Sequence, residues 1–183
     1  MKTNTKLMAL CEGAIMIALS LALSYVDIPL GFQGGSINLT MIPIIIYALR
    51  YGCVNGICAG LVFGTLKFFV GGGAAVNWQS MLLDYTVAYG AVGFAGLFKN
   101  VKNGDIFGTL AGGFMRFIVH FISGVTIYAE WAENTYLGIS TPTTFLYSVV
   151  YNAVYMVPSI ALAVILVPII FRALKKYWAK SAK

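Results

Sequence analysis

Arg116 and His120 lie one helical turn apart within a long apolar stretch, and Asp84 lies within another. An ionisable side chain is costly in hydrocarbon, so such groups normally face a partner or a polar cavity. A carboxylate, an imidazole and a guanidinium together have the chemistry to hold a polar or charged molecule. These residues therefore predict a ligand pocket within a lipid bilayer.

The chain that positions them is almost entirely apolar. Of its 183 residues, 60% are hydrophobic and only 10% are charged, whereas a soluble domain carries about 25% charged residues. A helical span needs about 20 residues, so six spans with short connections fill residues 1–183 as a single integral membrane substrate-binding domain. We expect an all-α membrane protein with helices over Lys6–Tyr25, Asn38–Leu49, Val54–Val70, Trp78–Phe98, Ile106–Tyr128 and Thr144–Ala173.

The basic residues predict the orientation of these six spans. If both termini face the cytoplasm, ten of the twelve Lys and Arg residues fall on the cytoplasmic side, and the outer loops carry only Asp27, Glu130 and Glu133. This distribution follows the positive-inside rule and indicates a multi-pass protein of a bacterial plasma membrane. The net charge of +6 therefore fits contact with membrane lipid and not nucleic-acid binding.

Three of the predicted helices carry polar side chains at a similar depth. At about 1.5 Å per residue, Asp84 lies roughly 9 Å from the outer end of its helix, and His120 and Asn152 lie roughly 12 Å from theirs. Tyr85 and Tyr147 are close to that level. We therefore expect a pocket in the outer half of the bilayer.

A lone carboxylate among aromatic rings suits a flat organic cation, because ring faces attract cations and the acid adds charge-assisted hydrogen bonds. Gly124 shares a helical stripe with Arg116 and His120, and we expect it to let a ligand ring approach the backbone. Tyr147 and Asn152 lie about 140° apart around a regular helix, so both face one pocket only if it wraps that helix or the helix is irregular.

Structural interpretations of the same residues remain open. In one alternative, Asp84 holds helices together by pairing with Arg116 or Lys67; in another, His120 is a satisfied interhelical side chain. For the two cations we expect Lys67 to extend to the outer interface. We expect Arg116 to lie beneath the pocket, neutralised by a carboxylate or by backbone carbonyls.

The motifs that are missing argue against an enzyme. The chain has no GxxxxGK[ST] phosphate loop and no HExxH motif. One histidine and three cysteines without CxxC spacing predict no metal site and no cofactor. A small intramembrane enzyme, or a purely structural membrane subunit, remains a less favoured alternative.

The first helix carries Ala14, Ala18 and Ala22 at four-residue spacing. Small side chains repeated in this way let another helix come close. The stripe fits either an internal helix contact or docking to a separate membrane subunit.

Taken together, these residues resemble a known family. The matching features are the size, the six spans, the alanine stripe, and the local runs Ile42-Pro43, Asp84-Tyr85, His120-Phe121-Ile122-Ser123-Gly124 and Tyr147 with Asn152. The chain resembles the substrate-binding S component of an energy-coupling factor (ECF) vitamin transporter, in particular the thiamine-specific type.

The resemblance implies that the protein binds thiamine from outside and docks on a transmembrane coupling protein driven by two cytoplasmic ATPase subunits. It implies that Asp84, next to Tyr85, takes the place of the family's acidic ligand-binding residue. It also implies that His120 stacks on a ligand ring and that Tyr147 and Asn152 contact the ligand. The family's outer tryptophan falls on Tyr128, with Trp131 three residues later, and Phe32 takes the place of the lid aromatic.

For the alanine stripe, the resemblance implies that Ala14, Ala18 and Ala22 face the coupling protein. The same fold with a thiamine precursor or another vitamin as ligand remains an alternative.

Overall fold

The computed structural model describes residues 5–30, 35–71, 73 and 75–181. Helices make up most of this part of the chain. They are α1 (Thr5–Leu23), α2 (Met41–Tyr51), α3 (Cys53–Val70), the short α4 (Trp78–Met81) and α5 (Ala88–Val92), α6 (Gly104–Thr126) and α7 (Thr144–Ser181). A π-helix over Leu82–Val87 joins α4 to α5, and 3₁₀ turns follow at Gly93–Phe98 and Ala129–Trp131. We call the continuous helical segment Trp78–Phe98 the fourth span.

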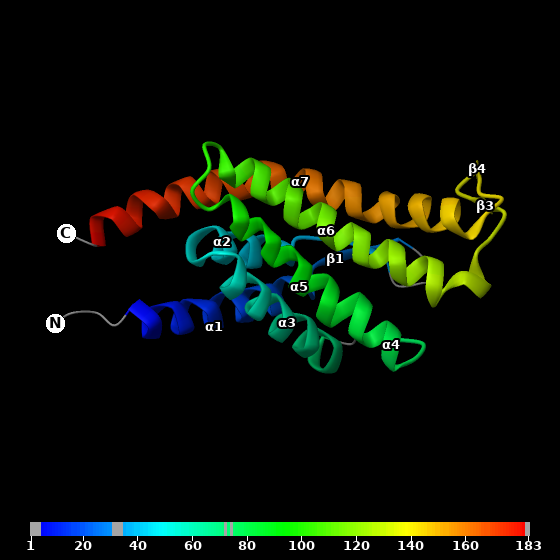
Figure 1. The fold of residues 1–183 in the computed structure, drawn as a ribbon, viewed down its shortest axis with the longest axis horizontal. Coiled ribbons are helices and arrows are strands. Elements are labelled where there is room, and N and C mark those ends of the chain that lie inside the picture. Colours follow the sequence, from blue (N-terminus) through cyan, green and yellow to red (C-terminus); the bar gives the residue numbers. More distant parts are fainter. Residues whose placement is uncertain (1–4, 31–34, 72, 74, 182–183) are drawn as a thin grey trace.

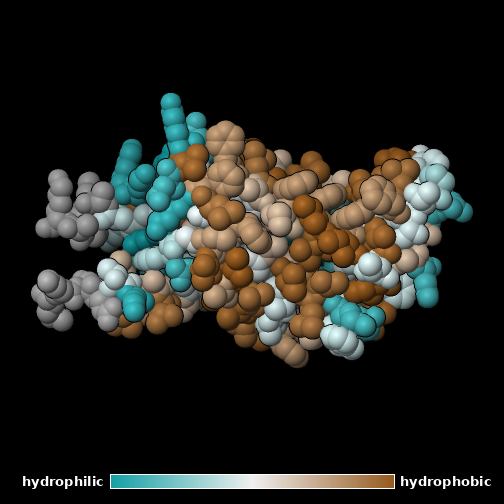
Figure 2. Space-filling model, in the orientation of Figure 1, coloured by the Kyte–Doolittle hydropathy of each residue, from teal (hydrophilic) through white to brown (hydrophobic). Residues whose placement is uncertain are grey.

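The helices form an elongated bundle whose two ends differ from its middle. Both ends of the chain lie at one end of the bundle (Figure 1). The space-filling view has an apolar belt between two hydrophilic ends (Figure 2). Five helical segments are long and apolar enough to cross a membrane, and α2 is a sixth, shorter apolar helix. The all-α architecture of six helices expected from the sequence is therefore confirmed.

The short second helix lies at the centre of the bundle. All of Met41–Leu49 is buried, and the side chains of Ile44 and Ile45 are fully enclosed. Its 11 residues extend about 16 Å, too little to cross the hydrocarbon. Because protein surrounds Met41–Leu49, this helix does not need to span the hydrocarbon by itself.

Two small hairpins were missed by the sequence analysis, which expected loops. Strand β1 (Asp27–Pro29) pairs antiparallel with β2 (Ser36–Asn38), and β3 (Thr135–Tyr136) pairs antiparallel with β4 (Ile139–Ser140). Strands of two or three residues are too short to display an alternating pattern. The second hairpin connects α6 to α7 at the end of the bundle away from the termini (Figure 1).

Glycines bring α3 against the fourth span. A Cβ atom on Gly60 would lie 2.1 Å from the carbonyl oxygen of Tyr89, and one on Gly64 would lie 2.2 Å from that of Tyr85. Together with Gly56 they form a repeat at four-residue spacing, which allows helix backbones to touch. This contact fixes the height at which Tyr85 and Tyr89 enter the bundle interior.

The fourth span is not the regular helix that the sequence analysis expected. It begins with a capping box in which Asn77 and Ser80 bond each other's backbone groups. The π-helix Leu82–Val87 follows directly and contains Asp84 and Tyr85. Single π turns of this kind concentrate at functional sites because they redirect side chains.

Candidate functional site

A cavity of about 220 Å³ opens between the fourth span, α6, α7 and the first hairpin. On this measure a single water needs roughly 10–15 Å³, so the space suits a small organic molecule. Seven of the nine residues predicted to bind a ligand line this cavity: Asp84, Tyr85, His120, Gly124, Tyr128, Tyr147 and Asn152.

The other two predicted residues are placed differently. The Trp131 side chain does not line the cavity; it is 44% exposed and packs against the ring of Tyr128, with the centroids 5.4 Å apart. Its position follows from the 3₁₀ turn Ala129–Trp131, which carries it outward beyond α6. Phe32 lies outside the described residues.

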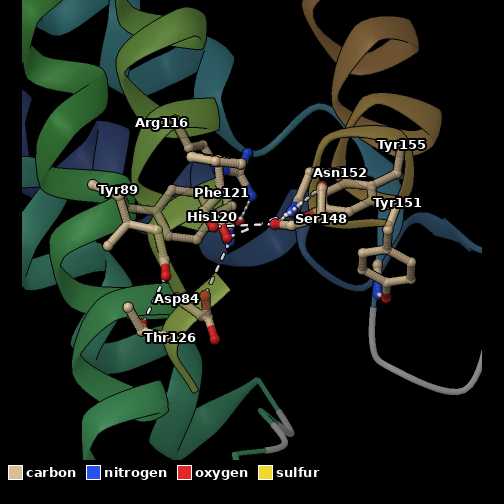
Figure 3. A network of polar contacts seen from close by, with 12 residues as sticks. Asp84, Tyr89, Arg116, His120, Phe121, Thr126, Ser148, Tyr151, Asn152 and Tyr155 are labelled. Carbon is tan, nitrogen blue, oxygen red and sulfur yellow. Dashed lines mark hydrogen bonds and ion pairs between the residues drawn. The ribbon is translucent and has the colours of Figure 1, made fainter. Parts of the chain in front are cut away.

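Asp84 faces His120 across the cavity. The Nδ1 atom of His120 lies 3.2 Å from the Asp84 carboxylate, and Figure 3 shows the two side chains meeting between their helices. The bond fixes the plane of the imidazole ring. None of the ion pairs between described residues joins Asp84 to Arg116 or Lys67. The structural pairing considered for Asp84 is therefore absent from the described part of the chain.

Asn152 is held within the wall that α7 presents to α6. Its amide donates to the backbone carbonyl of Ser148 at 2.8 Å, and its side-chain oxygen accepts from the Tyr155 hydroxyl at 2.5 Å. The Ser148 hydroxyl donates to the carbonyl of Phe121 at 3.0 Å, as Figure 3 also shows. These bonds lock the side chains that α7 turns toward the cavity.

Gly124 has a structural role in addition to the ligand contact that the sequence analysis expected. A Cβ atom there would lie 2.2 Å from the Ser148 hydroxyl oxygen. The missing side chain therefore admits Ser148, and with it α7, against α6. Gly124 also lines the cavity.

Four tyrosines, Tyr136, Tyr147, Tyr151 and Tyr155, form what we call the tyrosine ladder. Successive ring centroids are 5.7, 6.0 and 5.8 Å apart, and His120 continues the series 6.0 Å from Tyr155. Three of the rings recur at four-residue spacing along α7. Ser148 and Asn152 lie on an adjacent stripe of α7 and also line the cavity. The cavity therefore wraps around α7, as the angle of about 140° between Tyr147 and Asn152 requires.

The tyrosine hydroxyls at the outer end are neutral groups that can donate hydrogen bonds. Burial, followed by the charge of Asp84, raises the pKa of Tyr128 to about 12. Burial and the charge of Glu133 also raise the pKa of Tyr136. The Tyr151 hydroxyl accepts a bond from the backbone N–H of Gly35 at 3.0 Å, which ties the first hairpin to α7.

Two cations and a tyrosine form the deep end of the cavity, which we call the cationic floor: Lys67, Tyr89 and Arg116. The Lys67 ammonium donates to the Tyr89 hydroxyl at 3.1 Å, and Arg116 donates to the same oxygen at 3.0 Å. The outward extension expected for Lys67 is wrong, because this bond draws the side chain inward. The neutralisation expected for Arg116 is not found among the described residues, where its guanidinium donates to the Tyr89 hydroxyl and belongs to no ion pair. The guanidinium also lies 4.2 Å from the Tyr89 ring centroid.

Comparisons with known proteins agree with this fold. Residues 10–179 match the family described as "Thiamine transporter protein". The thiamine transporter ThiT of Bacillus subtilis (strain 168) is 31% identical, over 93% of this chain and 94% of its own length. ThiT of Lacticaseibacillus paracasei is 30% identical over 73% of this chain and 75% of its own.

A solved structure of ThiT from Listeria monocytogenes superimposes with a TM-score of 0.81 at 25% identity, covering 94% of this chain and 98% of that one. These relatives carry out transport and not catalysis, and the apolar helices place the protein in the cell membrane as a multi-pass protein. The chain belongs to the thiamine transporter family.

Proposed function

We propose that the chain captures thiamine from the extracellular side in this cavity, as the S component of an ECF importer. The single observation that carries the proposal is the Asp84 carboxylate, which is only 16% exposed and faces the cavity among aromatic rings. A buried carboxylate is costly unless a positive charge accompanies it. Thiamine supplies that charge in its thiazolium ring and has a second flat ring that carries an amine.

The arrangement suggests how the two rings are held. The thiazolium lies against Asp84 and the imidazole of His120, where the carboxylate and an aromatic face both favour a cation. The buried Nε2 atom of His120 has no hydrogen-bond partner among the described residues. The aminopyrimidine lies along the tyrosine ladder near Asn152, where flat surfaces and hydroxyl groups meet.

Replacing Asp84 tests this assignment. Asp84→Asn keeps the shape of the side chain but removes the charge, so we expect thiamine affinity to fall by about 2–5 kcal/mol. Isothermal titration calorimetry on the purified protein measures the change. Glu130→Gln is the matched control, since it removes an exposed carboxylate outside the cavity. Equal affinities in the two variants would exclude Asp84 from the site.

A related heterocycle is the second candidate ligand, and the charge on the ligand separates it from thiamine. The isolated aminopyrimidine precursor lacks the thiazolium cation, so it cannot compensate Asp84. We expect it to bind at least about a hundredfold more weakly than thiamine, the factor that corresponds to about 3 kcal/mol. Comparable affinities for the two compounds would favour a precursor transporter.

Docking on the coupling protein is proposed for the outer face of α1. Ala14, Ala18 and Ala22 are all exposed, so the stripe is not covered by another helix of the described chain. Large apolar neighbours such as Leu10, which is 71% exposed, extend the same surface. A coupling protein that carries the two cytoplasmic ATPase subunits would find a close helix contact here.

An enlarged side chain on this stripe separates docking from binding. Ala18→Met places a bulky side chain in the stripe, so we expect thiamine uptake into proteoliposomes with the complete importer to fall at least about tenfold while thiamine binding is unchanged. Ala161→Met is the matched control, because it adds the same side chain to an exposed position on α7. Normal uptake by Ala18→Met would remove the stripe from the docking surface.

A further inference from the structure

The cationic floor brings two positive charges close together. Lys67 and Arg116 both bond the hydroxyl oxygen of Tyr89, so their cationic nitrogens lie within about 6 Å of each other, where like charges repel in a low-dielectric interior. Arg116 is only 4% exposed. Neither cation belongs to an ion pair with a carboxylate in the described part of the chain.

The hydrogen bonds around Tyr89 do not require this residue to ionise. The Thr40 hydroxyl donates to the side-chain oxygen of Asn38, which leaves Thr40 to accept from the Tyr89 hydroxyl 3.0 Å away. Tyr89 therefore donates one bond and accepts two, which is the full capacity of a neutral phenol. A neutral Tyr89 therefore supplies no negative charge to balance Lys67 or Arg116.

Arg116 also has unused donors. Its Nε and Nη1 groups are buried and have no hydrogen-bond partner among the described residues. The only hydrogen bond found for the Lys67 ammonium within the described ranges is the one to Tyr89, and an ammonium has three donors. Both side chains line the cavity. The buried Nε and Nη1 donors of Arg116 would normally be satisfied, so they indicate a missing acceptor.

We propose that the cationic floor is an anion subsite, in which Lys67 and Arg116 hold an oxyanion of the phosphate class beside the bound cation. A guanidinium and an ammonium that both line one cavity and lie close together match the several oxygens of such a group. The oxyanion arrives either as a free ion or as a phosphate ester on the heterocyclic ligand. The anion subsite depends on the proposed function in one respect only, namely that the cation bound next to Asp84 is thiamine.

Charge balance explains why the subsite matters for the ligand. The cavity lining carries two cations, Lys67 and Arg116, and two carboxylates, Asp27 and Asp84, so a bound cation leaves it with one excess positive charge. An anion at the floor offsets this charge, so the two binding events favour each other. This reciprocity makes anion binding measurable through the affinity for thiamine.

Calorimetry in two buffers tests the subsite. Thiamine is first titrated into the wild-type protein with a bulky sulfonate as the only buffer anion, and then with inorganic phosphate added at constant ionic strength. Thiamine monophosphate is titrated in the phosphate-free buffer, and inorganic phosphate is titrated alone. We expect a gain in affinity of about tenfold or more, either for thiamine on adding phosphate or for the monophosphate over thiamine.

The two positive outcomes identify the source of the anion. Tighter thiamine binding in phosphate indicates a free ion, whereas tighter binding of the monophosphate indicates an ester carried by the ligand. If neither gain occurs and phosphate alone does not bind, the subsite is overturned even though thiamine still binds. If thiamine fails to bind in every buffer, the proposed function falls, and the titration of phosphate alone still decides the subsite.

Variants assign the effect to the floor. Arg116→Gln should abolish the gain and Arg116→Lys should keep most of it, because charge and not shape dominates. Lys67→Gln gives an independent variant at a less buried side chain, should Arg116→Gln fail to fold. Lys102→Gln removes a positive charge from an exposed loop and should leave the gain intact. Loss of the gain in Lys102→Gln as well would overturn a local subsite.

Discussion

On one side of the cavity α3 meets the fourth span through glycines, whereas on the other side α6 meets α7 through serine, asparagine and tyrosine. At Gly60 and Gly64 there is no room for a single added carbon atom. Across the cavity, Ser148 and Asn152 fill the contact and bond to the backbone of α6 or of their own helix. The acidic side of the site is thus positioned by backbone, and the aromatic side by side chains.

This difference predicts how each wall responds to mutation. In a wall made of touching backbones, an added atom forces two helices apart and moves every group they carry. In a wall made of side chains, the loss of one hydrogen bond leaves the others in place, and the net cost is about 0.5–1.5 kcal/mol. Variants of the two walls should therefore differ in size of effect and in what they disturb.

The largest effect is expected at Gly60. Gly60→Ala places a Cβ atom 2.1 Å from the carbonyl oxygen of Tyr89. The overpacking should lower the free energy of unfolding by about 2–3 kcal/mol, even after the better helix propensity of alanine. Thermal unfolding of the purified protein in detergent measures the loss, and thiamine affinity should fall with it because Tyr89 and the π-helix shift.

Cys58→Val is the control for this prediction. It adds volume to the same helix, but at an exposed position that faces away from the fourth span. We expect its thermal midpoint to stay close to that of the wild type. A loss in Cys58→Val as large as that in Gly60→Ala would mean that α3 tolerates no change anywhere, and the comparison of the two walls would lose its basis.

The glycine-lined wall was the part of the site that the sequence analysis missed. The repeat of Gly56, Gly60 and Gly64 is visible in the sequence and has the same spacing as the alanine stripe. A stripe of small residues shows that a helix can approach another closely, but it does not show which one. The π-helix could not be predicted for a similar reason. Its hydrogen bonds join residues i and i+5 instead of i and i+4, and an apolar segment carries no polar pattern that would reveal this change.

The polar residues on three helices were easier to place. Depth along each helix depends only on residue count, so Asp84, His120 and Asn152 could be put at one level, and all three line the cavity. Their partners could not be predicted, since direction around a helix decides whether Asp84 meets His120 or Arg116. The inward turn of Lys67 depends on a hydroxyl from another helix, which no local pattern reveals.

A smaller effect is expected at Gly124, where the aromatic side of the site also contains a close contact. Gly124→Ala places a Cβ atom 2.2 Å from the Ser148 hydroxyl oxygen, which rotation of that hydroxyl can partly relieve. We expect a loss of about 1–2 kcal/mol in stability. Adding Ser148→Ala removes the clashing oxygen, so the double variant should lose less than the sum of the single variants.

Strict additivity of these two changes would show that α6 and α7 have moved apart as rigid bodies. In that case the contact between α6 and α7 at Gly124 would respond to an added atom as the contact between α3 and the fourth span does. The two walls would then not differ in their response to mutation at this position. Unfolding midpoints of the wild type, both single variants and the double variant decide between these outcomes.

The smallest effect is expected at Tyr151, within the tyrosine ladder. Tyr151→Phe keeps the ring and its contacts with Tyr147 but removes the acceptor for the Gly35 N–H. Loss of one such bond costs about 0.5–1.5 kcal/mol, and only the attachment of the first hairpin depends on it. We therefore expect thiamine to dissociate several-fold faster, in stopped-flow measurements of tryptophan fluorescence, while the thermal midpoint changes little.

Tyr25→Phe is the matched control for Tyr151→Phe. It removes another tyrosine hydroxyl, one that donates to the carbonyl of Val70 at 3.1 Å and does not line the cavity. Like the bond of Tyr151, it is a single hydrogen bond between a tyrosine hydroxyl and the backbone, but it lies outside the site. Its loss should therefore leave the dissociation rate unchanged. Equal rates for both variants would mean that the hairpin is not held over the cavity by Tyr151. The aromatic wall would then act through ring packing alone, as the opposite wall acts through backbone packing.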